Sequence, residues 1–395
     1  MSRIQISFLG RAKRGEYSEA HYHFPDQSRE TDRFFGLALQ RHARPDRILF
    51  LGTTASMWDA LMEHIEFGST QEELREQIID AASEGTVTAA MLEPLEAPFS
   101  QALGVACRFR LIPHGANPEK QQQILATIAE EVPAEASLIL DLTHGLRHLP
   151  MIGLLSALYL EAVRDANVEG IYYGAMDLTE QQITPVLRLD WLRELVGWIQ
   201  DLRLFDYHGD LGVFEKRLAQ AGLDEQVVEK LRSGAFFERI NDLGRARAPL
   251  QNLGAELHHQ SLEGPAALFS DALLQRIDWA SKHYLQDRQA TFAWFHWRHG
   301  DYLRAVILGC EAFITSLVER NADPMNYRMR EDAKTRFRED TPRQRSRRTA
   351  FEELMDLRNS LAHGTRARGG AAQSVLRSER TLRAEIERLF RKLGL

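Results

Sequence analysis

The first 190 residues alternate short apolar runs, rich in β-branched residues, with longer segments whose apolar positions have helical spacing. The short runs predict strands at 4–9, 47–51, 107–112, 138–142 and 170–173, with 105 and 183–187 as weaker members. The longer segments predict helices at 32–41, 56–65, 70–82, 118–131 and 151–164. Strands that alternate with helices form parallel βα units. We therefore expect a Rossmann-like α/β domain at 1–190, with a mostly parallel sheet and helices on both faces.

From Trp191 onward the strand patterns stop and helical spacing remains. It predicts helices at 191–204, 214–222, 224–243, 266–285, 290–319, 349–364 and 378–393, with breaks at 206–212 and near Pro249. We expect a helical linker region at 191–265 and an all-α domain at 266–395.

Small and polar residues directly follow the predicted strands. In an open parallel sheet the carboxyl ends of the strands line one crevice, where glycine lets a ligand approach the backbone. Hydroxyl and N–H groups there suit phosphate or ribose oxygens, and arginine and histidine add donors and charge. The residues predicted to contact such a ligand are Gly10, Arg11, Gly52, Thr53, Thr54, Ser56, Thr143, His144, Gly145, Arg147, His148 and Gly174. Ordinary βα turns contain the same residue types, so a purely structural role is the alternative.

The helix predicted at 349–364 has signals at both ends. Thr349 and Glu352 have the spacing of a capping box, which places the helix start at Thr349. Gly364 suits the left-handed residue just beyond a helix end. The apolar stripe of this helix consists of Phe351, Leu354, Met355, Leu361 and Ala362.

Arg358, Asn359 and His363 on this helix are the predicted catalytic residues. A guanidinium within an apolar stripe must be paired or face a cleft, and Glu311 is a candidate partner. Asn359 and His363 are four residues apart, so they share one edge of the helix. Proton transfer by a histidine and a fixed cation beside a developing phosphate charge suit phosphodiester cleavage without a metal. The alternative is a solvated arginine and a histidine that caps the helix.

The net charge of −7, from 49 basic and 56 acidic residues, argues against a protein that binds nucleic acid through its overall charge. The distribution is uneven, because segment 328–348 holds nine Arg or Lys against four Asp or Glu. This segment is either a solvated loop or a rim that attracts phosphate beside the site. Segment 365–374, rich in Gly, Ala and Arg, is expected to form a mobile loop next to that site.

Several classes of protein are disfavoured by what the chain lacks. Cys107 and Cys310 are far apart, without CxxC or paired histidines nearby, so neither a disulfide framework nor a metal site is expected. There is no G-x-G-x-x-G after the first strand, and no P-loop, H-E-x-x-H or G-x-S-x-G motif. The chain begins almost directly with a strand and has no apolar run of membrane-spanning length, so we expect a cytoplasmic protein without membrane contact.

Two motifs resemble known families. Asp141-Leu142-Thr143-His144-Gly145, with the Phe8-Leu9-Gly10 and Leu51-Gly52-Thr53 strand ends and Ile171-Tyr172-Tyr173-Gly174-Ala175, resembles the CARF sensor domain. Arg358-Asn359 with His363 resembles the R-x4-6-H motif of HEPN ribonucleases. The order of the two is similar to that of the accessory ribonucleases of type III CRISPR systems.

The resemblance implies a CARF-like ligand-sensing domain at 1–190 and a HEPN-like ribonuclease domain at 266–395. It implies a homodimer, or a higher oligomer, that binds cyclic oligoadenylate and then cuts single-stranded RNA without a metal, leaving 2′,3′-cyclic phosphate ends in antiviral defence. Cyclic tetra-adenylate is the first candidate activator, but the sequence leaves the ring size open. The resemblance makes His363 the acid or base, Arg358 the group that stabilises the phosphorane charge, and Asn359 the residue that orients both.

Two other functions remain open from the sequence. One is a non-catalytic cyclic-nucleotide sensor or regulatory protein, whose helical half is an interaction module. A DNA-binding regulator is disfavoured because no clear basic recognition helix is present, although Arg343 to Arg348 leaves some room for one. The other is a sensor pocket that slowly cleaves its own ligand through His144 or His148.

Overall fold

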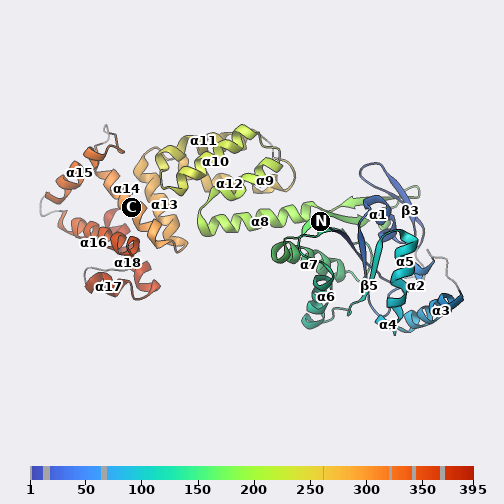
Figure 1. Ribbon diagram of the computed structural model, residues 1–395. Coiled ribbons are helices and arrows are strands. Elements are labelled where there is room, and N and C mark those ends of the chain that lie inside the picture. The colour runs from blue at the N-terminus through green and yellow to red at the C-terminus, as the bar shows by residue number, and fades with distance from the viewer. Residues whose placement is uncertain are drawn as a thin grey trace. The chain divides into compact units, whose positions relative to one another are not determined.

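A computed structural model of the chain (Figure 1) describes residues 2–11, 18–63, 69–260, 262–319, 323–339, 344–364 and 370–395. The chain forms two compact units, Met1–Arg193 and Glu194–Leu395. The first unit contains a sheet with helices and the second is helical, which confirms the predicted fold class.

The first unit is built on an eight-stranded sheet in the order β3-β2-β8-β7-β6-β1-β4-β5. Its strands are β1 (Arg3–Phe8), β2 (Ala20–His23), β3 (Arg29–Asp32), β4 (Arg47–Gly52), β5 (Ala106–Leu111), β6 (Ser137–Asp141), β7 (Asn167–Gly174) and β8 (Ile183–Arg188). Five neighbouring strands, β7, β6, β1, β4 and β5, run parallel to one another, whereas β8 is antiparallel to β7. All five predicted strands are present, and the weaker candidate at 183–187 is β8. The hairpin of β2 and β3 was not predicted, because its four-residue strands carry several polar residues.

Helices cover both faces of this sheet (Figure 1). The helices of this unit are α1 (Phe35–Ala43), α2 (Trp58–Met62), α3 (Ser69–Glu84), α4 (Ala89–Leu92), α5 (Glu96–Leu103), α6 (Pro118–Glu131) and α7 (His148–Arg164), with 3₁₀ turns η1 (Glu93–Leu95) and η2 (Met176–Leu178). Alternate residues of β4 show why both faces are covered: Ile48 and Phe50 pack into the cluster with α1, α2, α3 and α5, whereas Leu49 and Leu51 pack into the cluster with α6 and α7.

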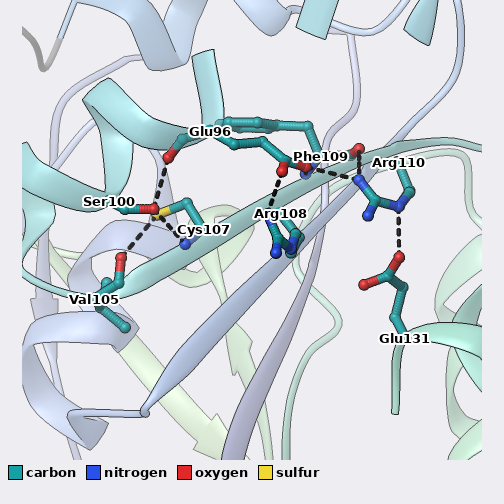
Figure 2. Close-up of polar contacts among 8 residues, drawn as sticks. All are labelled: Glu96, Ser100, Val105, Cys107, Arg108, Phe109, Arg110 and Glu131. Atoms are coloured by element: carbon teal, nitrogen blue, oxygen red, sulfur yellow. Dashed lines mark hydrogen bonds and ion pairs between the residues drawn. The ribbon is translucent and has the colours of Figure 1, made fainter. Parts of the chain in front are cut away.

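The edge strand β5 is closed by side chains from α5 and α6 (Figure 2). The Ser100 hydroxyl accepts the Cys107 N–H at 2.9 Å, and a Glu96 carboxylate oxygen accepts the Phe109 N–H at 3.1 Å. Glu96 also pairs with Arg108, and with Arg110 at 2.7 Å. Backbone donors that would otherwise recruit another strand are therefore already satisfied.

The second unit contains fourteen further elements in its described residues. They are α8 (Trp191–His208, which begins just before the boundary), η3 (Leu211–Phe214), α9 (Glu215–Gln220), α10 (Glu225–Arg239), α11 (Leu243–His259), η4 (Gly264–Phe269), α12 (Ser270–Ile277), η5 (Asp278–Ser281), α13 (Leu285–Arg298), α14 (Tyr302–Leu317), α15 (Tyr327–Glu339), α16 (Arg345–Ala362), α17 (Gly370–Val375) and α18 (Glu379–Leu393). Buried residues from Trp198 to Leu393 share one hydrophobic cluster. The division of this unit into a linker region at 191–265 and a domain at 266–395 stays a prediction.

Several predicted helix boundaries were wrong. The segment 290–319 is two helices, because the chain turns at Gly300, whose φ of 80° suits glycine, and Asp301 caps α14 by accepting the Arg304 N–H. The break predicted near Pro249 is absent, since α11 runs through that proline. Packing of the buried face of α11 outweighs the local cost of the proline.

Both cysteines are buried and free, as expected for core residues. Across the described ranges, no helix is both long and apolar enough to cross a membrane.

The closed edge of β5 leads to a prediction for stability. Replacing Glu96 with alanine is expected to lower the free energy of unfolding by about 1–3 kcal/mol and to promote aggregation, because the Phe109 N–H loses its charged acceptor. Urea unfolding and light scattering measure these two effects. Burial raises the pKa of Glu96, but the Phe109 N–H and both guanidinium groups outweigh it and leave that pKa lowered. The contribution of Glu96 to stability is therefore present above the ordinary pKa of a glutamate and is lost as the pH falls through the lowered pKa of the folded protein.

Glu93, an exposed residue one turn earlier, provides the matched control. Glu93→Ala should change neither unfolding nor aggregation. Equal stability of the Glu96→Ala and Glu93→Ala proteins would contradict the role given to Glu96.

Candidate functional site

The turns after β1, β4 and β6 meet at the carboxyl edge of the sheet. A Cβ atom on Gly10 would lie 2.7 Å from the backbone nitrogen of Gly145, so the first and third turns touch through their backbones. Gly145 has a φ of 103°, which favours glycine. The Gly10 carbonyl accepts the Met57 N–H at 3.0 Å, which joins the second turn. The fold thus brings Gly10, Gly145 and the 53–57 turn together, as the strand pattern predicted.

The polar residues of the turn after β4 are engaged within the protein. The Ser56 hydroxyl accepts the Thr53 N–H at 2.9 Å and donates to the Leu9 carbonyl at 3.0 Å. Thr53 and Ser56 are both buried, whereas Thr54 is half-buried at the edge. The first two residues therefore shape the turn, and Thr54 lies nearest to solvent.

Two predicted ligand residues, Gly52 and Gly174, are buried against aromatic rings. A Cβ atom on Gly52 would lie 2.5 Å from the Trp58 ring, and one on Gly174 would lie 2.9 Å from the Phe35 ring. The absence of a side chain therefore serves ring packing at both positions. Their predicted contact with a ligand stays a prediction.

A buried carboxylate, Asp141, links the ends of three strands. Its Oδ1 atom accepts the Thr143 N–H at 2.9 Å, the Ser7 hydroxyl also bonds to it, and Thr143 Oγ1 accepts the Gly174 N–H at 2.9 Å. The side chain is fully buried, and burial raises its pKa to about 6 against the opposing effect of the Thr143 and Ser7 donors. We did not predict Asp141 as a site residue, although a carboxylate at the end of a buried strand was a visible signal.

The His144 side chain is buried at the turn after β6. Its Nε2 atom accepts the Phe35 N–H at 3.3 Å, at the first residue of α1, and its ring stacks on Phe34 with centroids 4.9 Å apart. Burial lowers the pKa of the imidazole to about 4, so it is neutral at physiological pH. The neutral ring supplies the acceptor that the amino end of α1 needs, because Phe34 has no capping side chain.

The outer side of this turn carries the groups that solvent can reach. Arg11 and Arg147 are exposed, and His148 is half-buried, with Nε2 2.7 Å from the His114 carbonyl. Leu146, which precedes Arg147, is 46% exposed. We name the edge that carries Gly10, Arg11 and Arg147 the strand-end site. Its two arginines suit an anionic ligand, whereas its buried residues set the shape.

The second candidate site lies on α16, which starts one turn earlier than predicted. The helix begins at Arg345 after Gln344, and Thr349 is internal, donating its hydroxyl proton to the Arg345 carbonyl at 3.0 Å. The capping-box interpretation of Thr349 and Glu352 was therefore wrong. Arginine is a good helix former, so the basic residues before Thr349 continue the helix instead of preceding it.

The predicted catalytic residues lie at the carboxyl end of α16. Arg358 is half-buried and donates from Nη2 and Nε to Asn359 Oδ1, at 2.8 and 3.2 Å. Asn359 and His363 are exposed, and the His363 N–H donates to the Asn359 carbonyl at 3.1 Å. Gly364 follows with a φ of 69°, as its predicted place beyond the helix end requires. Arg358 thus borders the buried face, which includes Leu354 and Leu357.

Glu311 does not fill the role suggested for it. Its carboxylate pairs with the Arg330 guanidinium, which also donates to Thr315 Oγ1 at 2.9 Å. Arg358 is held by its neighbour Asn359 instead.

The basic segment 328–348 forms α15 and the start of α16, apart from residues 340–343, which lie outside the described part. Part of its charge is committed, since Arg336 pairs with Glu319 at 2.9 Å. Of the loop predicted at 365–374, residues 365–369 lie outside the described part, and Gly370–Val375 is helix α17, so the loop prediction was wrong for its second half.

Comparisons with known proteins identify the first unit. Residues 4–177 match the family model described as "CRISPR system endoribonuclease Csx1, CARF domain". The CRISPR-associated protein MJ1674 of Methanocaldococcus jannaschii is 23% identical over 270 residues, which are 63% of this chain and 42% of that protein. The match thus spans less than half of the relative's length. Csm6 of Enterococcus italicus, solved with cyclic hexa-2′-fluoro-hexa-dAMP, aligns over 100% of this chain and 94% of its own with 11% identity and a TM-score of 0.42.

The first unit is a CARF domain, the class of sensor that its sheet and turn motif predicted. The chain therefore contains a CARF domain like that of the CRISPR family model, and the relative that it matches is a CRISPR-associated protein.

The buried carboxylate gives a pH-dependent prediction. Between the ordinary pKa of 3.8 and about 6, folded Asp141 keeps a proton that the unfolded chain releases, so its contribution to stability falls as the pH rises. Asp141→Asn removes this titration and keeps an oxygen for the Thr143 N–H. The variant should gain about 3 kcal/mol in unfolding free energy relative to wild type between about pH 4 and about pH 7.

Urea denaturation followed by circular dichroism at several pH values measures this difference. Asp165→Asn, at an exposed residue in a left-handed conformation, is the control and should track wild type. A difference between Asp141→Asn and wild type that does not change with pH would refute the assignment.

Proposed function

We propose that the protein is an endoribonuclease that binds cyclic oligoadenylate at the strand-end site and then cleaves single-stranded RNA on α16. The observation that carries the proposal is the bonded Arg358–Asn359 pair, one turn before His363 at a helix end, in a chain that begins with a CARF domain. The cleaved strand would end in a 2′,3′-cyclic phosphate, as the resemblance to HEPN ribonucleases implies.

Arg358 is suited to bind the phosphate that is cleaved. A guanidinium has five N–H donors, and the bonds to Asn359 use Nε and Nη2. The remaining donors can contact two phosphate oxygens, whose charge grows as the 2′-oxygen attacks phosphorus. Asn359 positions the guanidinium by holding one side of its fork. Because Asn359 is exposed, an RNA strand can reach the Arg358–Asn359 pair.

His363 is suited to transfer the proton. The imidazole is exposed, four residues after Asn359 and thus on the same edge of α16. The reaction forms the bond from the 2′-oxygen to phosphorus and breaks the bond from phosphorus to the 5′-oxygen. One proton must leave the 2′-hydroxyl and one must reach the 5′-oxygen. A neutral imidazole can accept the first, and an imidazolium can supply the second.

A homodimer would supply both protonation states from two copies of His363. The CARF domain carries a surface suited to pairing: Met151, Leu155, Tyr159 and Val163 recur at every fourth residue of α7 and are each at least 41% exposed. An apolar stripe of this length on a surface helix is a typical interaction site. The stripe begins just after Arg147, so pairing two copies would place two strand-end sites side by side. A cyclic ligand of repeated units matches such two-fold symmetry.

The first functional prediction concerns cleavage. Labelled single-stranded RNA should be cut when cyclic tetra-adenylate or another ring size is added, also in the presence of a chelator. His363→Ala and Arg358→Ala should each lower the stimulated rate by roughly 100-fold or more, because each removes a group that acts in the transition state. Gel electrophoresis of the products measures the rate and the end groups.

Glu352→Ala, at an exposed residue of the same helix, is the control and should cut at the wild-type rate. Undiminished cleavage by His363→Ala would rule out the assignment. Ligand binding without cleavage at any ring size would instead support the non-catalytic sensor.

The second prediction concerns activation. Arg147→Ala should raise the activator concentration that gives half-maximal cleavage by about 5-fold or more, since an exposed guanidinium facing an anionic ligand contributes on the order of 1 kcal/mol. Cleavage without activator should stay unchanged, because the two sites are distinct. Arg29, exposed on β3, is the control. Equal activation curves for Arg147→Ala and Arg29→Ala would contradict the strand-end site.

A further inference from the structure

A pocket of ≈ 460 Å³ in the second unit lies apart from the predicted catalytic residues. Three segments surround it: the end of α8 and the turn after it, the end of α10, and the turn between α13 and α14. Gly209 and Gly300, with φ values of 65° and 80°, make the two turns. The break at 206–212, which the sequence marked and the proposed function does not use, forms one wall.

Two arginines from different helices face this pocket. Arg239 at the end of α10 contacts both carboxylate oxygens of Asp210 at 3.0 Å. Arg304 on α14 lies 3.5 Å from Asp301 and donates to the His208 carbonyl at 3.4 Å. The Arg239 side chain is 52% exposed and that of Arg304 is 31% exposed. Water screens such pairs, so an anionic ligand can compete for the guanidinium groups.

The two aspartates are already committed to the backbone. Asp210 accepts the Gly212 N–H at 2.9 Å, and Asp301 accepts the Arg304 N–H at 3.1 Å. Asp210 thus caps the short turn η3 and Asp301 caps α14, whose helix dipole offsets the negative charge of Asp301. This arrangement leaves the arginines as the groups that can change partner, and it disfavours a cation as the ligand.

An aromatic ring borders the same pocket. Tyr207 is 73% exposed, although burying a tyrosine ring is normally favourable. Its position beside two guanidinium groups is the combination that single-stranded nucleic acids require, since bases stack on exposed rings and phosphates bind forked cations.

We propose that this pocket binds one nucleotide of the single-stranded RNA substrate, with the base on Tyr207 and phosphate oxygens on Arg239 and Arg304. The inference rests on the proposed ribonuclease function and adds a place where the substrate is held outside the catalytic residues. Helix α14 connects the two places, because it carries Arg304 and packs against α16, which carries the predicted catalytic residues. A strand a few nucleotides long can therefore span both.

Binding of a non-cleavable RNA tests the proposal directly. Fluorescence anisotropy with a fully 2′-O-methylated single strand, in the presence of cyclic tetra-adenylate, gives the dissociation constant. Tyr207→Ala should weaken binding by about 5- to 150-fold, the range expected for one stacked base, whereas Tyr207→Phe should bind like wild type. Tyr327→Ala is the matched control, because Tyr327 is 75% exposed in the same unit and lies outside the pocket. Equal losses in Tyr207→Ala and Tyr327→Ala would overturn the proposal.

Salt dependence tests the phosphate contact. Arg239→Ala should reduce the slope of log affinity against log salt by about 0.7, the value for one phosphate contact on a single strand. Arg232→Ala, on the same helix and outside the pocket, should keep the wild-type slope. Competition by AMP or inorganic phosphate at concentrations below those of the RNA would show a site for a free nucleotide or ion and overturn the assignment to RNA.

The outcomes separate this inference from the proposed function. Activator-dependent cleavage by wild type with unchanged RNA binding by Tyr207→Ala would overturn the pocket and leave the ribonuclease intact. Absence of cleavage by wild type would overturn the ribonuclease itself. Unchanged RNA binding with an altered sedimentation coefficient for Tyr207→Ala would identify the pocket as a contact between copies of the chain.

Discussion

The carboxylate of Asp141 is completely buried at the end of β6, so donors from neighbouring strands must satisfy it. Thr143 and Ser7 provide donors for Oδ1, whereas Oδ2 has no hydrogen-bond partner among the described residues. Thr143 in turn accepts from Gly174, which ties together the ends of β1, β6 and β7. The turn between Asp141 and Arg147 therefore has a set conformation before any ligand arrives. Such preorganisation reduces the entropy that binding must overcome.

In the second unit, too, hydrogen bonds and ion pairs with nearby residues position the charged groups. Asn359 holds Arg358 at the edge of the buried face of α16, and the aspartates of the α8 and α14 turns hold Arg239 and Arg304. A guanidinium that is held on one side keeps donors for a phosphate on the other. The proposed catalytic site and the proposed RNA-binding pocket would thus both use an arginine that a neighbouring side chain holds on one side.

Much of the fold was predictable because it follows from local periodicity. Strands buried on both faces read as largely apolar runs, which is why β1, β4 and β6 were found in the sequence, whereas the edge strand β5 alternates buried and exposed residues. The hairpin of β2 and β3 was missed because short polar strands owe their pairing to β8 rather than to their own pattern. The start of α16 was missed because a good capping-box signal at Thr349 lies inside a longer helix.

The sequence by itself determined the residue types at each strand end, the glycine after α16 and the neighbouring Arg358 and Asn359. Which of these groups face solvent was decided by tertiary structure. His144 became a buried cap for α1, Glu311 was taken by Arg330, and Asp141 emerged as the link between strands. The reason is physical: spacing along a chain specifies secondary structure, but burial and hydrogen-bond partners depend on segments that are distant in sequence.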